Sequence, residues 1–167
     1  MFPVYGLADA SLAVTFPAVG ATLSTLHVDR GALGPGDPLR AIDAGAAGAL
    51  ELVRLGTPVQ GCELQIADAD GANVPAGIVG RILIRGANVS PGYYDDSAAT
   101  AASRTAGGWF DTGDLGALHD GQLVVTGRIK EVLFVAGQNH YPQDIELVLT
   151  RHAGIEAGRA AATGVRP

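Results

Sequence analysis

The chain has 167 residues, of which 47% are hydrophobic and 17% charged, a composition typical of a folded domain, or of one domain and part of another. Its 11 Lys and Arg residues against 17 Asp and Glu give a net charge of −6 with no basic run, which argues against a nucleic-acid surface. No apolar run approaches the roughly 20 residues that a membrane span needs, and the N-terminus does not resemble a signal peptide, so the sequence predicts a cytoplasmic protein.

The first part of the chain is weakly patterned. "MFPVYGLADASLAVTF" places a Tyr-Gly pair almost at the start. The region that follows is rich in Gly, Ala and Pro, and "DRGALGPGDPLRAIDAGAAGAL" has the turn residues of a loop. We therefore expect an irregular insertion at about residues 17–56.

The pattern sharpens from Cys62, the single cysteine. "CELQIAD" at 62–68 alternates apolar and polar residues, which predicts a half-buried strand with Cys62 as a core thiol. "GIVGRILIRG" at 77–86 predicts a more buried strand. "DDSAATAASRT" at 95–105 begins with capping residues and predicts a short helix. In "LGALHDGQLVVTG" at 115–127, an Asp-Gly pair between two apolar runs predicts a hairpin.

The last part of the chain has a different pattern, a strand, a helix and a further strand. "EVLFVAG" at 131–137 predicts a buried strand, and residues 137–141 predict a polar turn. Pro142 suits the first turn of a helix, and Gly154 is placed to end it. "RAAATGV" at 159–165 predicts one more strand. The apolar face of the expected helix consists of Ile145, Val148, Leu149 and His152.

Four stretches, in this order, resemble adenylate-forming (AMP-binding) enzymes. They are most similar to the fatty acyl-AMP ligases that supply polyketide and nonribosomal peptide assembly. The stretches are "VYGLADASLAV" at 4–14, "GRILIRGANVSPGYY" at 80–94, "WFDTGDLG" at 109–116 and "GRIKEVLFVAGQNHYPQDIE" at 127–146.

The resemblance implies an α+β fold. Residues 1–128 would be the C-terminal part of the large AMP-binding domain, containing a small distorted β-barrel or mixed sheet. Residues 129–167 would be the beginning of the small C-terminal α+β domain.

The resemblance also implies an activity. A complete enzyme of this kind activates a fatty acid with ATP and Mg²⁺ to an acyl-adenylate and passes the acyl group to the thiol of an acyl carrier protein. The phosphate-binding loop and catalytic lysine of the family do not occur in this sequence, so no catalytic residue is assigned and the chain alone is expected to be inactive. The alternatives are part of an acyl-CoA synthetase, or a non-catalytic module that binds a nucleotide or a carrier protein.

The resemblance assigns five residues to a nucleotide and its metal ion. Tyr5 would pack on the adenine ring, and Gly6 would let the backbone approach it. Asp9 stands where the family has glutamate and would hold Mg²⁺, a hard cation that prefers oxygen ligands. Asp114 would accept hydrogen bonds from both ribose hydroxyls. Arg128 would contact the ribose or phosphate through its forked guanidinium.

The resemblance also assigns two residues to a movement of the small domain. Lys130 would be a hinge about which the small domain rotates, and Gly137 would lie in the loop that approaches the acyl acceptor. Each assigned residue could instead have a purely structural role without a ligand, as a buried aromatic, a turn residue or a solvated cation. Asp111 is expected only to cap a turn, and Arg81, where the family has glutamate, is interpreted as a surface substitution.

Overall fold

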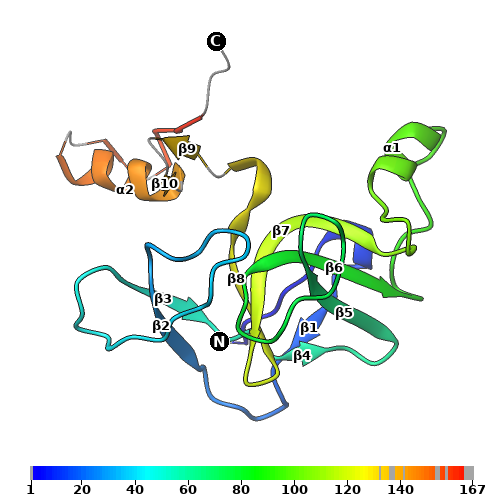
Figure 1. Cartoon of the computed structure of the whole chain (residues 1–167), viewed down its shortest axis with the longest axis horizontal. Coiled ribbons are helices and arrows are strands. Elements are labelled where there is room, and N and C mark those ends of the chain that lie inside the picture. The colour runs from blue at the N-terminus through cyan, green and yellow to red at the C-terminus, as the bar shows by residue number, and fades with distance from the viewer. Residues whose placement is uncertain are drawn as a thin grey trace. The chain divides into compact units, whose positions relative to one another are not determined.

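A computed structural model describes residues 2–131, 133–135, 138–140, 142–152, 155–156 and 158–163. The chain divides into two compact units, residues 1–126 and 127–167, and each is described by itself (Figure 1). The assignment of residues 1–128 to a large domain and of 129–167 to a small one stays a prediction.

In chain order, the elements up to the end of the first unit are η1 (Ala8–Ala10), β1 (Thr15–Phe16), β2 (Thr25–Asp29), β3 (Ala49–Val53), β4 (Thr57–Pro58), β5 (Cys62–Ala67), β6 (Gly80–Gly86), α1 (Ser97–Ala102), β7 (Phe110–His119) and β8 (Gln122–Arg128). The last residues of β8 already belong to the second unit. The remaining elements are η2 (Ile129–Glu131), β9 (Leu133–Val135), β10 (Gln138–His140) and α2 (Pro142–His152).

The main sheet has the strand order β5-β6-β7-β8 (Figure 1). Consecutive residues Ile82, Leu83 and Ile84 of β6 are each 0% exposed. Because neighbouring residues of a strand point to opposite faces, both faces of β6 are covered, as expected for an interior strand. One buried cluster consists of Tyr5, Ala10, Val14, Cys62, Ile66, Ile82, Ile84, Phe110 and Leu123.

The predicted α+β class is confirmed: antiparallel strands make up most of the regular structure, with α1 between β6 and β7 and α2 after β10. The sheets in the described part of the chain are open, with β5 and β8 at the two edges of the main sheet, and do not close into a barrel. The predicted strands at 62–68 and 77–86 are β5 and β6, which pair antiparallel. Burial raises the pKa of the Cys62 thiol, in agreement with its expected place in the core.

The region at 17–56 is more regular than the sequence indicated, and this expectation is corrected. Strands β2 and β3 pair antiparallel there, with Leu26 and Val28 buried. Val28 also forms a bridge to Ala41, within the connection between the two strands. The alternation of Leu26 and Val28 with polar residues was the available signal, but the long turn-rich connection between the strands obscured it.

The local turn and cap predictions are confirmed. Asp120 and Gly121, between β7 and β8, have φ angles of 50° and 73°, which are the positive values that a tight hairpin turn requires. Asp96 caps α1, because its side chain accepts a hydrogen bond of 2.8 Å from the backbone N–H of Ala99.

The second unit agrees with the sequence in part. Strand β9 and helix α2, which begins at Pro142, are confirmed. Residues 138–140, expected to be part of a turn, form strand β10 and pair antiparallel with β9. Residues 159–163 contain no strand, because the apolar pattern there finds no partner strand among the described residues. The expected helix end at Gly154 lies outside the described residues.

Three apolar residues of the face predicted for α2, Ile145, Val148 and Leu149, are exposed at 38%, 53% and 38%.

No helix in the described part of the chain has the length and apolar character needed to cross a membrane.

The buried position of Ile84 generates a stability prediction. Replacing Ile84 by alanine should lower the free energy of unfolding by about 2–5 kcal/mol, because the substitution removes buried methyl groups and leaves a cavity. The matched change Val19→Ala, at a side chain that is 98% exposed, should have little effect. Urea denaturation followed by circular dichroism measures both. Equal losses in the two variants would contradict the position of the core.

Candidate functional site

Asp114 lies in a β-bulge of strand β7. The pairing of β6 with β7 joins Arg81 to Leu115 and Leu83 to Asp111, so Ile82 alone lies opposite the three residues 112–114. Such an irregularity bends a strand and redirects its side chains, and bulges are frequent next to functional sites.

The bulge is held by hydrogen bonds of its own residues. Thr112 donates its hydroxyl to the carbonyl of Ile82 at 2.9 Å and accepts the N–H of Asp114 at 3.1 Å. Asp111 accepts the N–H of Gly113 at 3.1 Å, as expected of a turn-capping aspartate. Gly113 has a φ of 76°, a conformation that glycine adopts at little cost. The Asp-Thr-Gly-Asp sequence therefore fixes its own backbone.

Tyr5 and Asp114 are joined directly. The Tyr5 hydroxyl donates a hydrogen bond of 2.7 Å to Oδ2 of Asp114, across 109 residues of sequence. The two residues are only 8% and 7% exposed. Hydrogen bonds to a charged group contribute about 1.5–3 kcal/mol, roughly twice the value for neutral partners. This contact brings the first and third of the four stretches together.

Gly6 has a structural reason to be glycine. A Cβ atom at this position would lie 1.5 Å from the carbonyl oxygen of Leu12. The turn formed by residues 7–12 therefore folds back onto the backbone of Gly6. This close approach within the protein requires glycine whether or not a ligand is bound.

Asp9 lies in η1 and contacts the second stretch. Its carbonyl oxygen accepts the N–H of Ser90 at 2.7 Å. Burial raises the pKa of the Tyr93 phenol, and the nearby negative charge of Asp9 raises it further. Asp9 is thus tied to the second stretch through its backbone, and its carboxylate acts on the ionisation of Tyr93.

Asn88, which the sequence did not single out, also holds the first stretch in place. Its Nδ2 donates to the carbonyl of Ala13 at 2.8 Å, and its own carbonyl accepts the Ser11 hydroxyl at 3.1 Å. An asparagine within a turn-forming stretch was the only signal, and it did not indicate which loop would be the partner.

Arg81 is not a simple surface substitution, and that interpretation is corrected. Its guanidinium forms an ion pair with the carboxylate of Asp111 and donates to the carbonyl of Ala69 at 3.3 Å. The side chains of Arg81 and Asp111 are 30% and 16% exposed, so the pair is partly desolvated. The ion pair links the second and third stretches next to the bulge.

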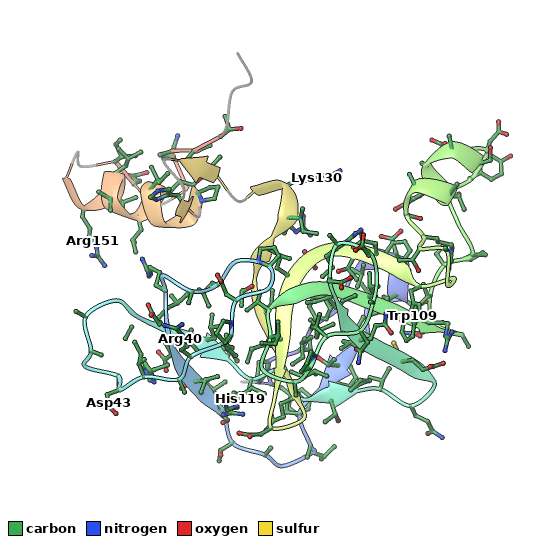
Figure 2. All side chains as sticks on the ribbon, viewed as in Figure 1. Arg40, Asp43, Trp109, His119, Lys130 and Arg151 are labelled. Atoms are coloured by element: carbon green, nitrogen blue, oxygen red, sulfur yellow. The ribbon has the colours of Figure 1, made fainter. Side chains whose placement is uncertain are left out.

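A second cation, Arg85, lies four residues further along β6. The guanidinium of Arg85 is 4.5 Å from the centre of the Trp109 ring, which is labelled in Figure 2. Arg85 also pairs with Glu63 at 2.7 Å. Cation–π contacts of this kind contribute about 0.5–1 kcal/mol at exposed sites.

The remaining predicted residues belong to the second unit. Arg128 is the exposed last residue of β8, and Lys130 is exposed in η2, between β8 and β9, where Figure 2 labels it. Gly137 lies outside the described residues. The roles of these three residues stay predictions.

Three stretches that are distant in the sequence therefore converge within the first unit and carry Asp9 and Asp114 on turns tied by side-chain hydrogen bonds. A family model described as AMP-binding enzyme matches residues 1–94, more than half of the sequence. The chain belongs to this family of AMP-binding enzymes.

Comparison with individual proteins shows that the chain is similar to fatty acyl-AMP ligases within this family. The chain is 37% identical to a long-chain-fatty-acid–AMP ligase of Mycobacterium tuberculosis, over 98% of its own length and 29% of the ligase. A solved structure from work on fatty acyl-adenylate ligases of E. coli and L. pneumophila has a TM-score of 0.83 at 35% identity, over 97% of this chain and 29% of that one. A fatty acyl-adenylate ligase of L. pneumophila in complex with acyl adenylate and pyrophosphate has a TM-score of 0.70 at 34% identity, over 91% and 27%.

The chain thus spans about 29% of the length of the curated relatives it matches. Among the residues that the structure describes, no group of three or more His, Cys, Asp or Glu side chains could hold a metal ion.

The contact of Tyr93 with Asp9 generates a pH prediction. The difference in absorbance between the wild type and Tyr93→Phe should show a phenol that ionises above about pH 10, the ordinary value. Asp9→Asn should lower that pKa, because it removes a negative charge, whereas Asp43→Asn in an exposed loop should not.

The sign of the effect on stability follows from linkage. The folded state keeps the Tyr93 proton at a pH where the unfolded chain has lost it. The contribution to stability is therefore complete at neutral pH and is lost as the pH rises from about 10 through the folded pKa. An unchanged titration in Asp9→Asn would show that the two groups do not interact.

Proposed function

We propose that the chain forms the nucleotide-sugar-binding part of a fatty acyl-AMP ligase. Such an enzyme activates a fatty acid with ATP to an acyl-adenylate and transfers the acyl group to a carrier-protein thiol. The observation that supports the proposal best is the position of Asp114, held in the bulge of β7 and by the hydroxyl of Tyr5. The similarity to proteins named as fatty-acid–AMP ligases favours this branch of the family.

In this proposal, Asp114 receives the ribose hydroxyls, because a carboxylate can accept hydrogen bonds from both members of a cis-diol. Tyr5, whose hydroxyl is bound to Asp114, and the adjacent Gly6 contribute to the adenine side. Arg128 supplies a fixed positive charge for the ribose or phosphate. Preorganised groups of this kind bind without the cost of ordering them when the ligand arrives.

Lys130 is proposed as the hinge, and Gly137 as part of the loop that meets the acyl acceptor. Lys130 lies in a short 3₁₀ turn between two strands, close to Gly127, where the second unit begins. Hinges are commonly short segments at the ends of elements, where backbone rotation is absorbed. The cytoplasmic location expected from the sequence stays a prediction.

Mg²⁺ fits the chemistry of this donor set, because a carboxylate supplies the oxygen ligand that this hard cation prefers. Asp9 is the proposed protein ligand, and the hydrogen bond from the Ser90 N–H to its carbonyl oxygen ties its backbone to the second stretch. Mg²⁺ is usually bound through one or two carboxylates together with substrate phosphates and water. When bound, it would neutralise the negative charge of the phosphates.

Two alternatives are separated by experiment. An acyl-CoA synthetase would deliver the acyl group to CoA, and assays of an enzyme containing this chain with CoA and with a carrier protein distinguish the acceptors. A non-catalytic module would bind a nucleotide or carrier protein, and a protein containing this chain would then form no acyl-adenylate from ATP and a fatty acid.

Nucleotide binding tests the role of Asp114. Titration with AMP, followed by NMR chemical shifts, should give saturable changes in the wild type and none in Asp114→Ala, which loses the acceptor for the ribose. Asp43, labelled in Figure 2 in the loop between β2 and β3, is an exposed acid that provides the matched control. Asp43→Ala makes the same change in charge and should bind like the wild type. Equal binding by the two variants would contradict the proposed site.

Catalysis by the 167 residues alone is expected to be absent. The resemblance places the phosphate-binding loop and the catalytic lysine in segments that this sequence does not contain, and phosphoryl chemistry depends on such charge-stabilising groups. Isotopic ATP–pyrophosphate exchange with a fatty acid should remain at the background of a protein-free control. Exchange above that background would mean that the catalytic groups are present within these residues.

A further inference from the structure

The hydrogen bond between Tyr5 and Asp114 joins two rigid segments. On one side, the Tyr5 carbonyl accepts the N–H groups of Val14 and Thr15, each at 3.0 Å, and the Tyr5 N–H donates to the Thr15 carbonyl at 3.3 Å. The Tyr5 ring belongs to the buried cluster that includes Val14 and Phe110. The hydroxyl is therefore a donor fixed in position by both the backbone and the packing of the ring.

The acceptor is fixed from the opposite side. Asp114 is the last residue of the bulge. Its N–H donates to the hydroxyl of Thr112, and that hydroxyl donates to the carbonyl of Ile82. With the backbone of Asp114 held in this way and Oδ2 held by Tyr5, rotation of the carboxylate plane would break a hydrogen bond between buried groups. Breaking a buried hydrogen bond to a charged group has a high cost.

We propose that Tyr5 is a positioning residue that sets the orientation of the Asp114 carboxylate, and thereby the preference of the protein for a ribonucleotide over a 2′-deoxyribonucleotide. This inference rests on the proposed function, because it takes Asp114 to be the ribose acceptor. The inference adds a role for the hydroxyl of Tyr5. The family resemblance gave a role only to its aromatic ring, which would pack on adenine.

The physical reason lies in the geometry of a cis-diol. Its two hydroxyls are held on one side of the sugar, and a carboxylate meets both only when its plane is correctly oriented. A site built to bind a hydroxyl rejects the analogue that lacks it, because a buried polar group is then left without a partner. A carboxylate that rotates freely meets either nucleotide less well and distinguishes them less.

The experiment compares AMP with 2′-deoxyadenosine monophosphate on the whole chain, by NMR titration of the wild type, Tyr5→Phe and Tyr94→Phe. Tyr5→Phe keeps the ring and removes only the hydroxyl. Tyr94→Phe removes the same group from a side chain that is fully exposed, and it is the matched control. We expect the wild type and Tyr94→Phe to prefer AMP by about tenfold or more, and Tyr5→Phe to lose most of that preference, a change of about 1.4 kcal/mol in relative affinity.

The outcomes separate the two proposals. If the wild type prefers AMP and Tyr5→Phe keeps the full preference, the positioning role is wrong while the ribose site stands. If the wild type does not distinguish the nucleotides, the assignment of Asp114 to the ribose is wrong, and the positioning role fails with it. A melting curve of each variant shows whether a loss of preference accompanies a loss of fold.

A measurement on the wild type decides the question if Tyr5→Phe does not fold. A buried phenol bound to a carboxylate exchanges its proton slowly and gives a separate downfield NMR signal, which is assigned by its absence in Asp114→Ala. AMP should shift this signal, and 2′-deoxyadenosine monophosphate should shift it less. A signal that responds equally to both nucleotides would overturn the inference.

Discussion

The bulge at residues 112–114 is the constraint on which the candidate site depends. Without it, the register of β6 and β7 would place Asp114 directly opposite Ile82, whose side chain is fully buried. A carboxylate in such surroundings has a large desolvation cost unless it finds hydrogen bonds. The bulge instead ties the backbone of Asp114 to Thr112 and leaves the carboxylate in reach of the Tyr5 hydroxyl. The irregular register thus makes an acid tolerable in the interior of the sheet.

The residues of the first stretch serve the fold and the candidate site together. Gly6 is required by the carbonyl of Leu12, and Tyr5 is part of the buried cluster as well as the partner of Asp114. A substitution at either position therefore changes the packing of the protein together with any contact to the proposed ligand. Loss of binding in a variant is informative about the ligand only when the stability of that variant is measured too.

Local chemistry could be predicted from the sequence, and long-range pairing could not. Asp120-Gly121 and Pro142 define their turn and helix start by backbone preferences that act within a few residues. The partners of Asp114 and Asp111 lie 109 and 30 residues away, and no local pattern specifies them. Strands β2 and β3 were missed for the same reason, since the chain between them has the composition of a loop. The family resemblance named candidate residues, and the folded structure shows which of them meet, as Tyr5 and Asp114 do.

The contact of Arg85 with Trp109 has a practical consequence. Trp109 is the single tryptophan of the chain, and it immediately precedes the strand that carries the bulge. Indole emission depends on nearby charge and on exposure to water, and here a guanidinium lies 4.5 Å from the ring. The tryptophan fluorescence of the protein therefore comes from one known place, and its colour and intensity report the state of the start of β7 without any added label.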